Sequence, residues 1–88
     1  MNHRNSSLQI DIMTVIYEHT KLRGHPEITM VDLKEAMKEK RECHSVSITR
    51  SCQKLAERNL IKRIIDVQSL KLSLSLTAEG EKTLAENG

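Results

Sequence analysis

The sequence predicts a mainly α-helical domain with one small antiparallel β-hairpin, in the order helix, helix, helix, strand, strand, helix. One change along the chain predicts this fold class. Apolar residues recur at helical spacing up to residue 59. Residues 60–66 are then rich in β-branched side chains, and residues 70–76 alternate strictly between apolar and polar, which is typical of a half-buried strand. The 88 residues are too few for a second hydrophobic core, so residues 1–88 are expected to form a single domain.

The composition excludes several classes of protein. Hydrophobic residues make up 38% of the chain and are almost all aliphatic, which suffices for a core and argues against intrinsic disorder. No apolar run approaches the ~18 residues of a membrane span, and residues 1–24 lack the apolar segment of a secretory signal. Two cysteines are too few for a disulfide framework. We therefore expect a cytoplasmic protein that makes no contact with a membrane.

The first helix is expected to follow a cap at Ser6 or Ser7, because a short hydroxyl can satisfy one of the open backbone N–H groups. It is expected to end at Gly24, since glycine suits the left-handed conformation that closes many helices. The His-Pro pair at residues 25–26 prevents its continuation.

The apolar stripe of this helix is wider than one packing partner needs, which indicates a second contact. We expect Ile10, Met13 and Tyr17 to form a homodimer interface together with Leu84 of the last helix, because a large apolar patch is seldom left exposed. The stripe also includes Leu8, Ile12, Val15, Ile16 and Leu22.

The second helix is expected to begin at Thr29, with Asp32 three residues later as a variant of the capping box. Its buried face is Leu33, Ala36 and Met37, and it is expected to end within the polar residues 40–42.

The third helix is expected to start near His44 or Ser45 and to run to Arg58. Ile48, Cys52 and Leu55 follow one another at steps of four and three, so they are predicted to face the core. Asn59 is the predicted stop, because asparagine tolerates the left-handed conformation better than other non-glycine residues.

Strands are expected over residues 60–66 and 70–76, joined by a short turn at residues 67–69. In the second strand the four leucines at residues 70, 72, 74 and 76 share one face. Thr77 ends this strand and caps a last helix from Ala78 to about Ala85, which Gly80 is expected to weaken.

Positive charge gathers in the middle of the chain. Residues 38–63 carry a net charge of +5, whereas the rest of the chain carries −3. A basic block inside a folded domain is typical of a surface that binds a polyanion.

Two segments carry a resemblance to a known family. Residues 47–50 followed by Leu55…Leu60-Ile61-Lys62-Arg63 resemble the recognition helix and wing of bacterial winged helix-turn-helix regulators. Leu76-Thr77-x-x-Gly80 resembles the strand-to-helix turn of the MarR family. The resemblance covers about residues 28–84. It implies a module that binds double-stranded DNA. We expect a sequence-specific regulator of transcription that acts as a homodimer, because one recognition helix contacts only a few base pairs and two-fold pairing doubles the site.

The sequence departs from that family in three places. The spacing from Leu33 in the second helix to Leu55 in the third is longer than usual by about one helical turn. The wing lacks the usual tip rich in Asp and Arg, and the long flanking helices that dimerise MarR proteins are missing. The resemblance therefore implies a DNA-binding module rather than an effector-responsive repressor.

A recognition helix offers its N-terminal half to base edges in the major groove. Arg50 can pair bidentately with guanine and Gln53 with adenine; the alternative for Arg50 is a salt bridge to Glu57 or Glu42. The candidate base contacts are Ser45, Val46, Ser47, Thr49, Arg50 and Gln53, and the candidate phosphate contacts are Lys54, Lys62, Arg63 and Lys71.

Two other functions stay open. The first is a winged-helix module that contacts proteins without binding DNA, which the modest net charge of +2 favours. The second is a metal or thiol sensor built on Cys43, His44 and Cys52, although no C-x-x-C pair is present. No nucleophile–base arrangement or phosphate-binding loop is present, so we expect neither enzymatic activity nor a cofactor, and no metal.

Overall fold

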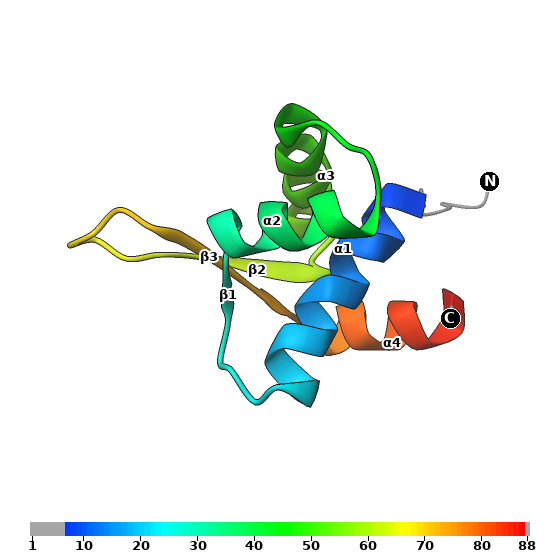
Figure 1. Ribbon diagram of the computed structural model, residues 1–88. Coiled ribbons are helices and arrows are strands. Elements are labelled where there is room, and N and C mark those ends of the chain that lie inside the picture. The colour runs from blue at the N-terminus through cyan, green and yellow to red at the C-terminus, as the bar shows by residue number, and fades with distance from the viewer. Residues whose placement is uncertain (1–6, 88) are drawn as a thin grey trace.

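The computed structural model describes residues 7–87, and its helices gather around one end of a small sheet (Figure 1). It has the predicted fold class of four helices and an antiparallel hairpin, with one short strand added before the second helix. The elements are α1 (Ser7–Tyr17), η1 (Glu18–Leu22), β1 (Ile28–Thr29), α2 (Met30–Lys40), α3 (Ser45–Glu57), β2 (Ile61–Ile65), β3 (Leu72–Leu76) and α4 (Ala78–Asn87).

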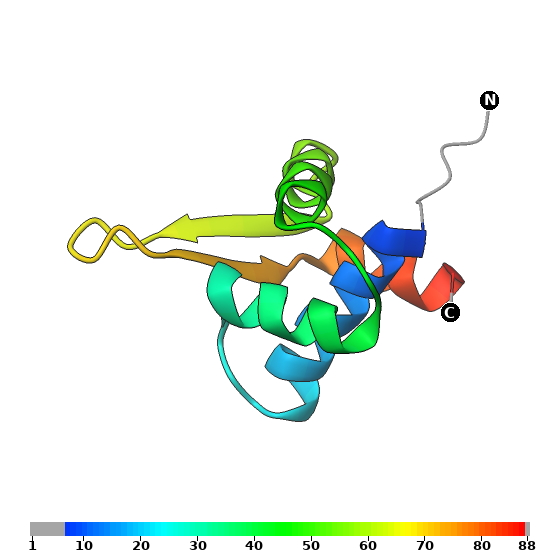
Figure 2. The same cartoon turned by 45° about the horizontal axis from the view of Figure 1, so that its top comes forward.

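The sheet is antiparallel, in the order β1-β3-β2. Ile28 pairs with Leu74, and along the hairpin Ile61 pairs with Leu76 and Ile65 with Leu72. The hairpin of residues 61–76 is the wing, and its outer part extends well beyond the helices (Figures 1 and 2). Strand β1 was not predicted, because two residues are too short to show alternation.

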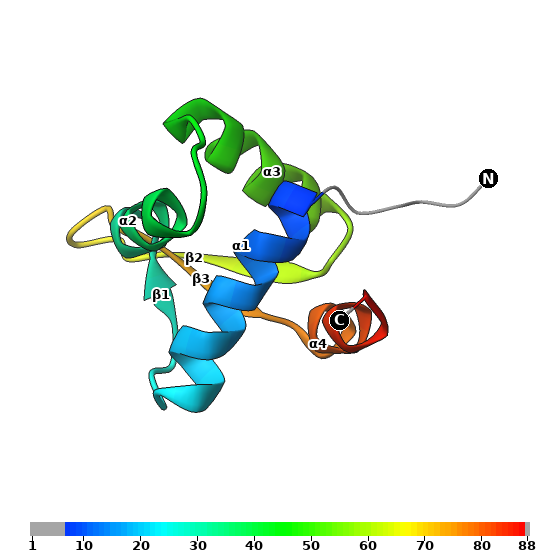
Figure 3. The same cartoon turned by 45° about the vertical axis from the view of Figure 1, so that its right-hand side comes forward.

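Helix α1 lies at the centre of the fold, where it contacts α2, α3, α4 and β3 (Figure 3). Met13 is fully buried in the core. Its predicted place at a dimer interface is therefore wrong: the stripe is wide because a central helix packs against several elements of its own chain. Ile10, Tyr17 and Leu84 are only half-buried.

The end of this helix also differs from the prediction. The chain widens into the π-helical turn η1, and the Arg23 N–H donates to the Glu18 carbonyl at 3.1 Å. Because a π-turn holds more residues than an α-turn, it rotates the helix surface and changes the direction of the side chains at its end. Leu22 is consequently 69% exposed and does not belong to the buried stripe. Gly24 has the predicted left-handed conformation, with φ 77°.

Two predicted caps are confirmed. The Asp32 N–H donates to the Thr29 hydroxyl at 3.2 Å at the start of α2. Asn59 has φ 61° just after α3. Helix α1 is described from Ser7 onward, so Ser7 lies within the helix, and Ser6 lies outside the described residues.

The prediction for Leu70 is wrong. Strand β3 begins at Leu72, whereas Leu70 lies in the turn with φ 58° and is 77% exposed. The turn is longer than three residues because backbone hydrogen bonds close it from Asp66 to Lys71.

A compact junction joins the end of α3, the base of the wing and the start of α4. The Thr77 hydroxyl donates toward the carbonyl oxygens of Asn59 and Leu60, at 2.7 and 2.9 Å, and accepts from the Gly80 N–H at 2.9 Å. A Cβ on Gly80 would overlap with the Leu60 carbonyl oxygen. Glycine is therefore required at this position for close packing.

Candidate nucleic-acid interface

Helix α3 divides into a buried stripe and an exposed face. Ile48, Cys52 and Leu55 are almost fully buried, as their spacing predicts, and Ser51 is also buried between them. The first acidic residue of the helix is Glu57, in its last turn. The exposed face is therefore polar and cationic over most of its length.

The predicted base contacts lie on this exposed face, with the exception of Ser47, which is half-buried. Val46, Arg50 and Gln53 follow one another at steps of four and three, which places them on one side of the helix. Val46 is 63% exposed, so its methyl groups are free for contact. The Thr49 hydroxyl donates to the Ser45 carbonyl at 3.1 Å, so part of its hydrogen-bonding capacity is used within the helix.

Arg50 is exposed, and it forms no ion pair or hydrogen bond with any residue that the structure describes. The alternative of a salt bridge to Glu57 or Glu42 is therefore not present in the described part of the chain. The guanidinium is free to bind a ligand.

The predicted phosphate contacts Lys54, Lys62, Arg63 and Lys71 are all exposed, but they do not share one surface. Arg63 pairs across the hairpin with Leu74, whereas Lys62 pairs with Ser75. Successive residues of a strand point to opposite faces. Arg63 thus stands on the sheet face of the buried Leu74, which packs against the helices. Lys62 points from the opposite face.

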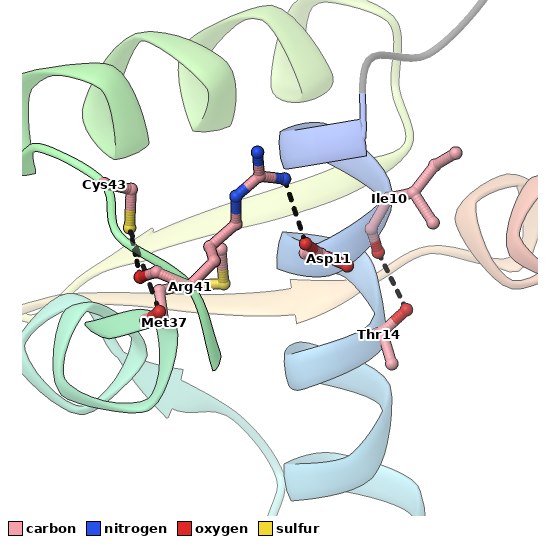
Figure 4. A network of polar contacts seen from close by, with 6 residues as sticks. All are labelled: Ile10, Asp11, Thr14, Met37, Arg41 and Cys43. Atoms are coloured by element: carbon pink, nitrogen blue, oxygen red, sulfur yellow. Dashed lines mark hydrogen bonds and ion pairs between the residues drawn. The ribbon is translucent and has the colours of Figure 1, made fainter. Parts of the chain in front are cut away.

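The approach to α3 is held by an interaction that the sequence did not predict. The Arg41 guanidinium pairs with the Asp11 carboxylate at 3.1 Å and so ties the end of α2 to α1 (Figure 4). The two residues are thirty positions apart, so no local pattern could reveal the pair. The pair is partly exposed and contributes about 1 kcal/mol or less.

The two cysteines are in different environments. Cys52 is buried as predicted, and burial raises the pKa of its thiol to about 11. Cys43 is half-buried before α3, with its thiol aimed at the carbonyl oxygens of Arg41 and Met37, at 3.6 and 3.8 Å (Figure 4). Among the described residues, no three His, Cys, Asp or Glu side chains are grouped to hold a metal ion.

None of the helices in residues 7–87 is long and apolar enough to cross a membrane.

Three helices, a three-stranded sheet with a protruding hairpin, and a free polar face on the third helix define a winged helix-turn-helix domain. Two solved structures share this fold with the chain, both of mutants of S. aureus MepR, one of them from a multidrug resistant clinical isolate. Their TM-scores are 0.71 and 0.74, each with 20% sequence identity, over 89% and 92% of this chain. The predicted winged-helix fold is thereby confirmed.

The chain spans about half the length of these MepR structures, 51% and 54%. No protein-family model and no curated protein sequence matches the chain.

Proposed function

We infer that this domain is a transcription regulator that binds double-stranded DNA sequence-specifically and acts through binding rather than catalysis. One observation carries the proposal: the exposed face of α3 is cationic, and its Arg50 is engaged with no described residue. A winged-helix domain binds DNA by placing this helix in the major groove. The basic segment of residues 38–63 supplies the long-range attraction to phosphates.

Different side chains of α3 and the wing are proposed to contact bases and phosphates, according to their chemistry. Arg50 pairs with the O6 and N7 atoms of guanine, and Gln53 pairs with adenine. Val46 contacts a thymine methyl group, which suits its exposed apolar side chain. Lys54 on α3 and Arg63 and Lys71 on the wing contact phosphates and fix the position of the helix.

The regulator is proposed to be a homodimer. One recognition helix reads only a few base pairs, and a two-fold dimer doubles the site. Of the residues predicted for the interface, Ile10, Tyr17 and Leu84 are half-buried on α1 and α4 and remain available for it. Sedimentation at high micromolar concentration is expected to give the mass of two chains. A monomer under those conditions would contradict the dimer and leave DNA binding standing.

The test of DNA binding begins with selection of duplexes from a random library by the wild-type protein. Arg50→Ala is expected to cost about 1–3 kcal/mol on the selected duplex and to relax the preference at one base pair. Lys54→Ala is expected to weaken binding to selected and random duplexes alike and to reduce the salt slope by about one unit. Lys82→Ala removes the same charge from an exposed position on α4 and serves as the control. Its affinity for both kinds of duplex is expected to be unchanged.

Two results would count against the proposal. If the wild-type protein shows no salt-dependent binding to any duplex, the domain is a protein-interaction module instead. If Arg50→Ala and Lys54→Ala lose affinity equally on every sequence, then Arg50 contacts only phosphate and another side chain reads the bases.

A further inference from the structure

A groove with an apolar floor runs between α1 and η1 on one side and α2 on the other, and has a volume of about 520 Å³. Val15 and Ile28 are almost fully buried beneath it, and Ala36 is half-buried. His19 also lines the groove, and burial lowers the pKa of its imidazole, which is therefore neutral at neutral pH. The remaining lining residues are charged and form the rim: Glu18, Arg23, Asp32, Glu35, Glu39 and Lys40.

The rim has more negative than positive charge, with four carboxylates against two cations. Asp32, Glu35 and Glu39 follow one another at steps of three and four on α2, a spacing at which like charges repel. The carboxylates of Glu18, Glu35 and Glu39 form no ion pair with any residue that the structure describes. A cation brought to this rim from outside would relieve the repulsion.

The tip of the wing has the complementary chemistry. Val67 is 86% exposed and Leu70 77%, and the hairpin holds them away from the helices (Figures 1 and 2). Lys71 follows Leu70 directly, so an apolar side chain and a cation stand next to each other. The whole wing carries three cations against the single carboxylate of Asp66.

Hydrogen bonds hold the tip in one conformation. The Asp66 N–H donates to the Lys71 carbonyl at 3.0 Å, and the Leu70 N–H donates to the Asp66 carbonyl at 2.6 Å. The Asp66 carboxylate accepts from the Gln68 N–H at 2.9 Å. A tip that is ordered in advance loses little conformational freedom when it binds.

The tip and the groove therefore match, with apolar surface on both and opposite net charges. Because Val67 and Leu70 are so exposed, the tip does not occupy the groove of its own chain. An apolar projection that fits a pocket elsewhere on the same kind of molecule joins copies head to tail.

We propose that the wing tip of one copy docks into the groove of a second copy. Val67 and Leu70 cover the apolar floor, and Lys71 pairs with the carboxylates of the rim. Lys71 is also a proposed phosphate contact, so this contact between copies belongs to the protein that is free of DNA.

The contact goes beyond the proposed function and does not depend on it. Helices α2 and α4 lie on opposite sides of α1 (Figure 3), so the groove is on the other side of α1 from the α4 part of the proposed homodimer. A hairpin tip buries less than the roughly 1,000 Å² of a stable interface, so the dissociation constant is expected to be on the order of 1 mM.

Paramagnetic NMR on a mixture of two forms of the chain tests the contact. One form carries a nitroxide at the tip through Gln68→Cys, together with Cys43→Ser, while the native Cys52 is buried. The other form is labelled with ¹⁵N and carries no nitroxide. At a concentration near the dissociation constant, the amide signals of residues 32–40 in the ¹⁵N chain are expected to broaden more strongly than those of α4.

Charge reversal makes the test specific. Glu35→Lys in the ¹⁵N chain is expected to weaken the contact about tenfold, and Lys71→Glu in the nitroxide chain to do the same, because each replaces an attraction with a repulsion. The two changes together restore opposite charges and are expected to restore the broadening. Lys82→Glu reverses a charge at an exposed position on α4 and is the matched control, with broadening of the groove unchanged.

The apolar part of the contact is tested by the double variant Val67→Ser, Leu70→Asn in the nitroxide chain. It is expected to weaken the contact about tenfold, and asparagine keeps the left-handed backbone at position 70, where φ is 58°. Well-dispersed ¹⁵N spectra of all variants establish that they are folded.

Four results would overturn the inference and leave DNA binding by α3 standing. The first is broadening of the groove no stronger than that of the rest of the chain, and the second is broadening that charge reversal does not change. The third is broadening centred on α4, which would place the tip at the proposed homodimer face. The fourth is a double variant at residues 67 and 70 that still broadens the groove but binds the selected duplex more weakly, because the tip then contacts DNA instead.

Discussion

Replacing Gly80 with alanine tests the junction that fixes α4. Helix propensity alone favours the replacement by about 1 kcal/mol, because alanine is a better helix former than glycine. The structure predicts the opposite sign, since the new Cβ overlaps with the Leu60 carbonyl oxygen. That carbonyl is held by the Thr77 N–H at 3.1 Å and faces the Thr77 hydroxyl at 2.9 Å, so it cannot move without disturbing both.

The magnitude is the sum of these effects. Overpacking costs about 1–3 kcal/mol and two weakened hydrogen bonds about 1 kcal/mol each, against the gain of about 1 kcal/mol in propensity. We expect Gly80→Ala to lower the free energy of unfolding by about 2–4 kcal/mol. At about 4–8 °C per kcal/mol, this lowers the melting temperature by at least roughly 8 °C.

Urea unfolding followed by circular dichroism measures the change, since the chain has no Trp to report by fluorescence. Lys82→Ala and Lys82→Gly form the control pair, because Lys82 is exposed in the same helix. There the alanine variant is expected to be the more stable by about 1 kcal/mol. A Gly80→Ala protein as stable as the wild type would refute the close approach of α4 to Leu60.

Two further predictions concern Thr77 at this junction and Cys52 in the core. Thr77→Val is expected to lower the free energy of unfolding by about 1–2 kcal/mol, because it removes the cap of α4 and the bonds to the end of α3, while Thr77→Ser retains them; urea unfolding of both variants checks this. The pKa of Cys52 is raised from 9.0 to about 11, so between these pH values the unfolded chain has lost a proton that the folded chain keeps. Stability therefore falls as pH rises through this interval, by up to about 1.4 kcal/mol per pH unit, and Cys52→Ala is expected to show a shallower slope. Equal slopes would mean that the thiol is not buried.

The local signals in the sequence predicted much of this fold. Thr29, Asn59 and Thr77 each act through their own backbone neighbourhood, so their residue types were enough to place the helix ends. The failures have a different origin. The burial of Met13 depends on four elements packed around α1, and the conformation of Leu70 depends on hydrogen bonds that close the turn. Neither the burial of Met13 nor the conformation of Leu70 follows from the spacing of apolar residues in the sequence.

The candidate site shows the same division. The spacing of α3 predicted which face is buried, and therefore which side chains are free. The sequence also identified the cations of the wing, but the faces on which Lys62 and Arg63 stand depend on the register of the hairpin. That register could not be fixed, because no Asn-Gly or Asp-Gly turn marks it.

Hydrogen bonds and an ion pair hold the chain at both ends of α3. They determine how α3 and the wing, the proposed DNA surface, are positioned relative to the rest of the fold. The chain that enters the helix is tied to α1 through Arg41 and Asp11. The chain that leaves it is bonded at Asn59 and Leu60 to Thr77, which also ends the wing and starts α4. The base of the wing and the end of α3 therefore share one set of hydrogen bonds and move together. A dimer contact through α1 and α4 would consequently set the position of both DNA-binding elements, and the spacing of two half-sites would report the geometry of that contact.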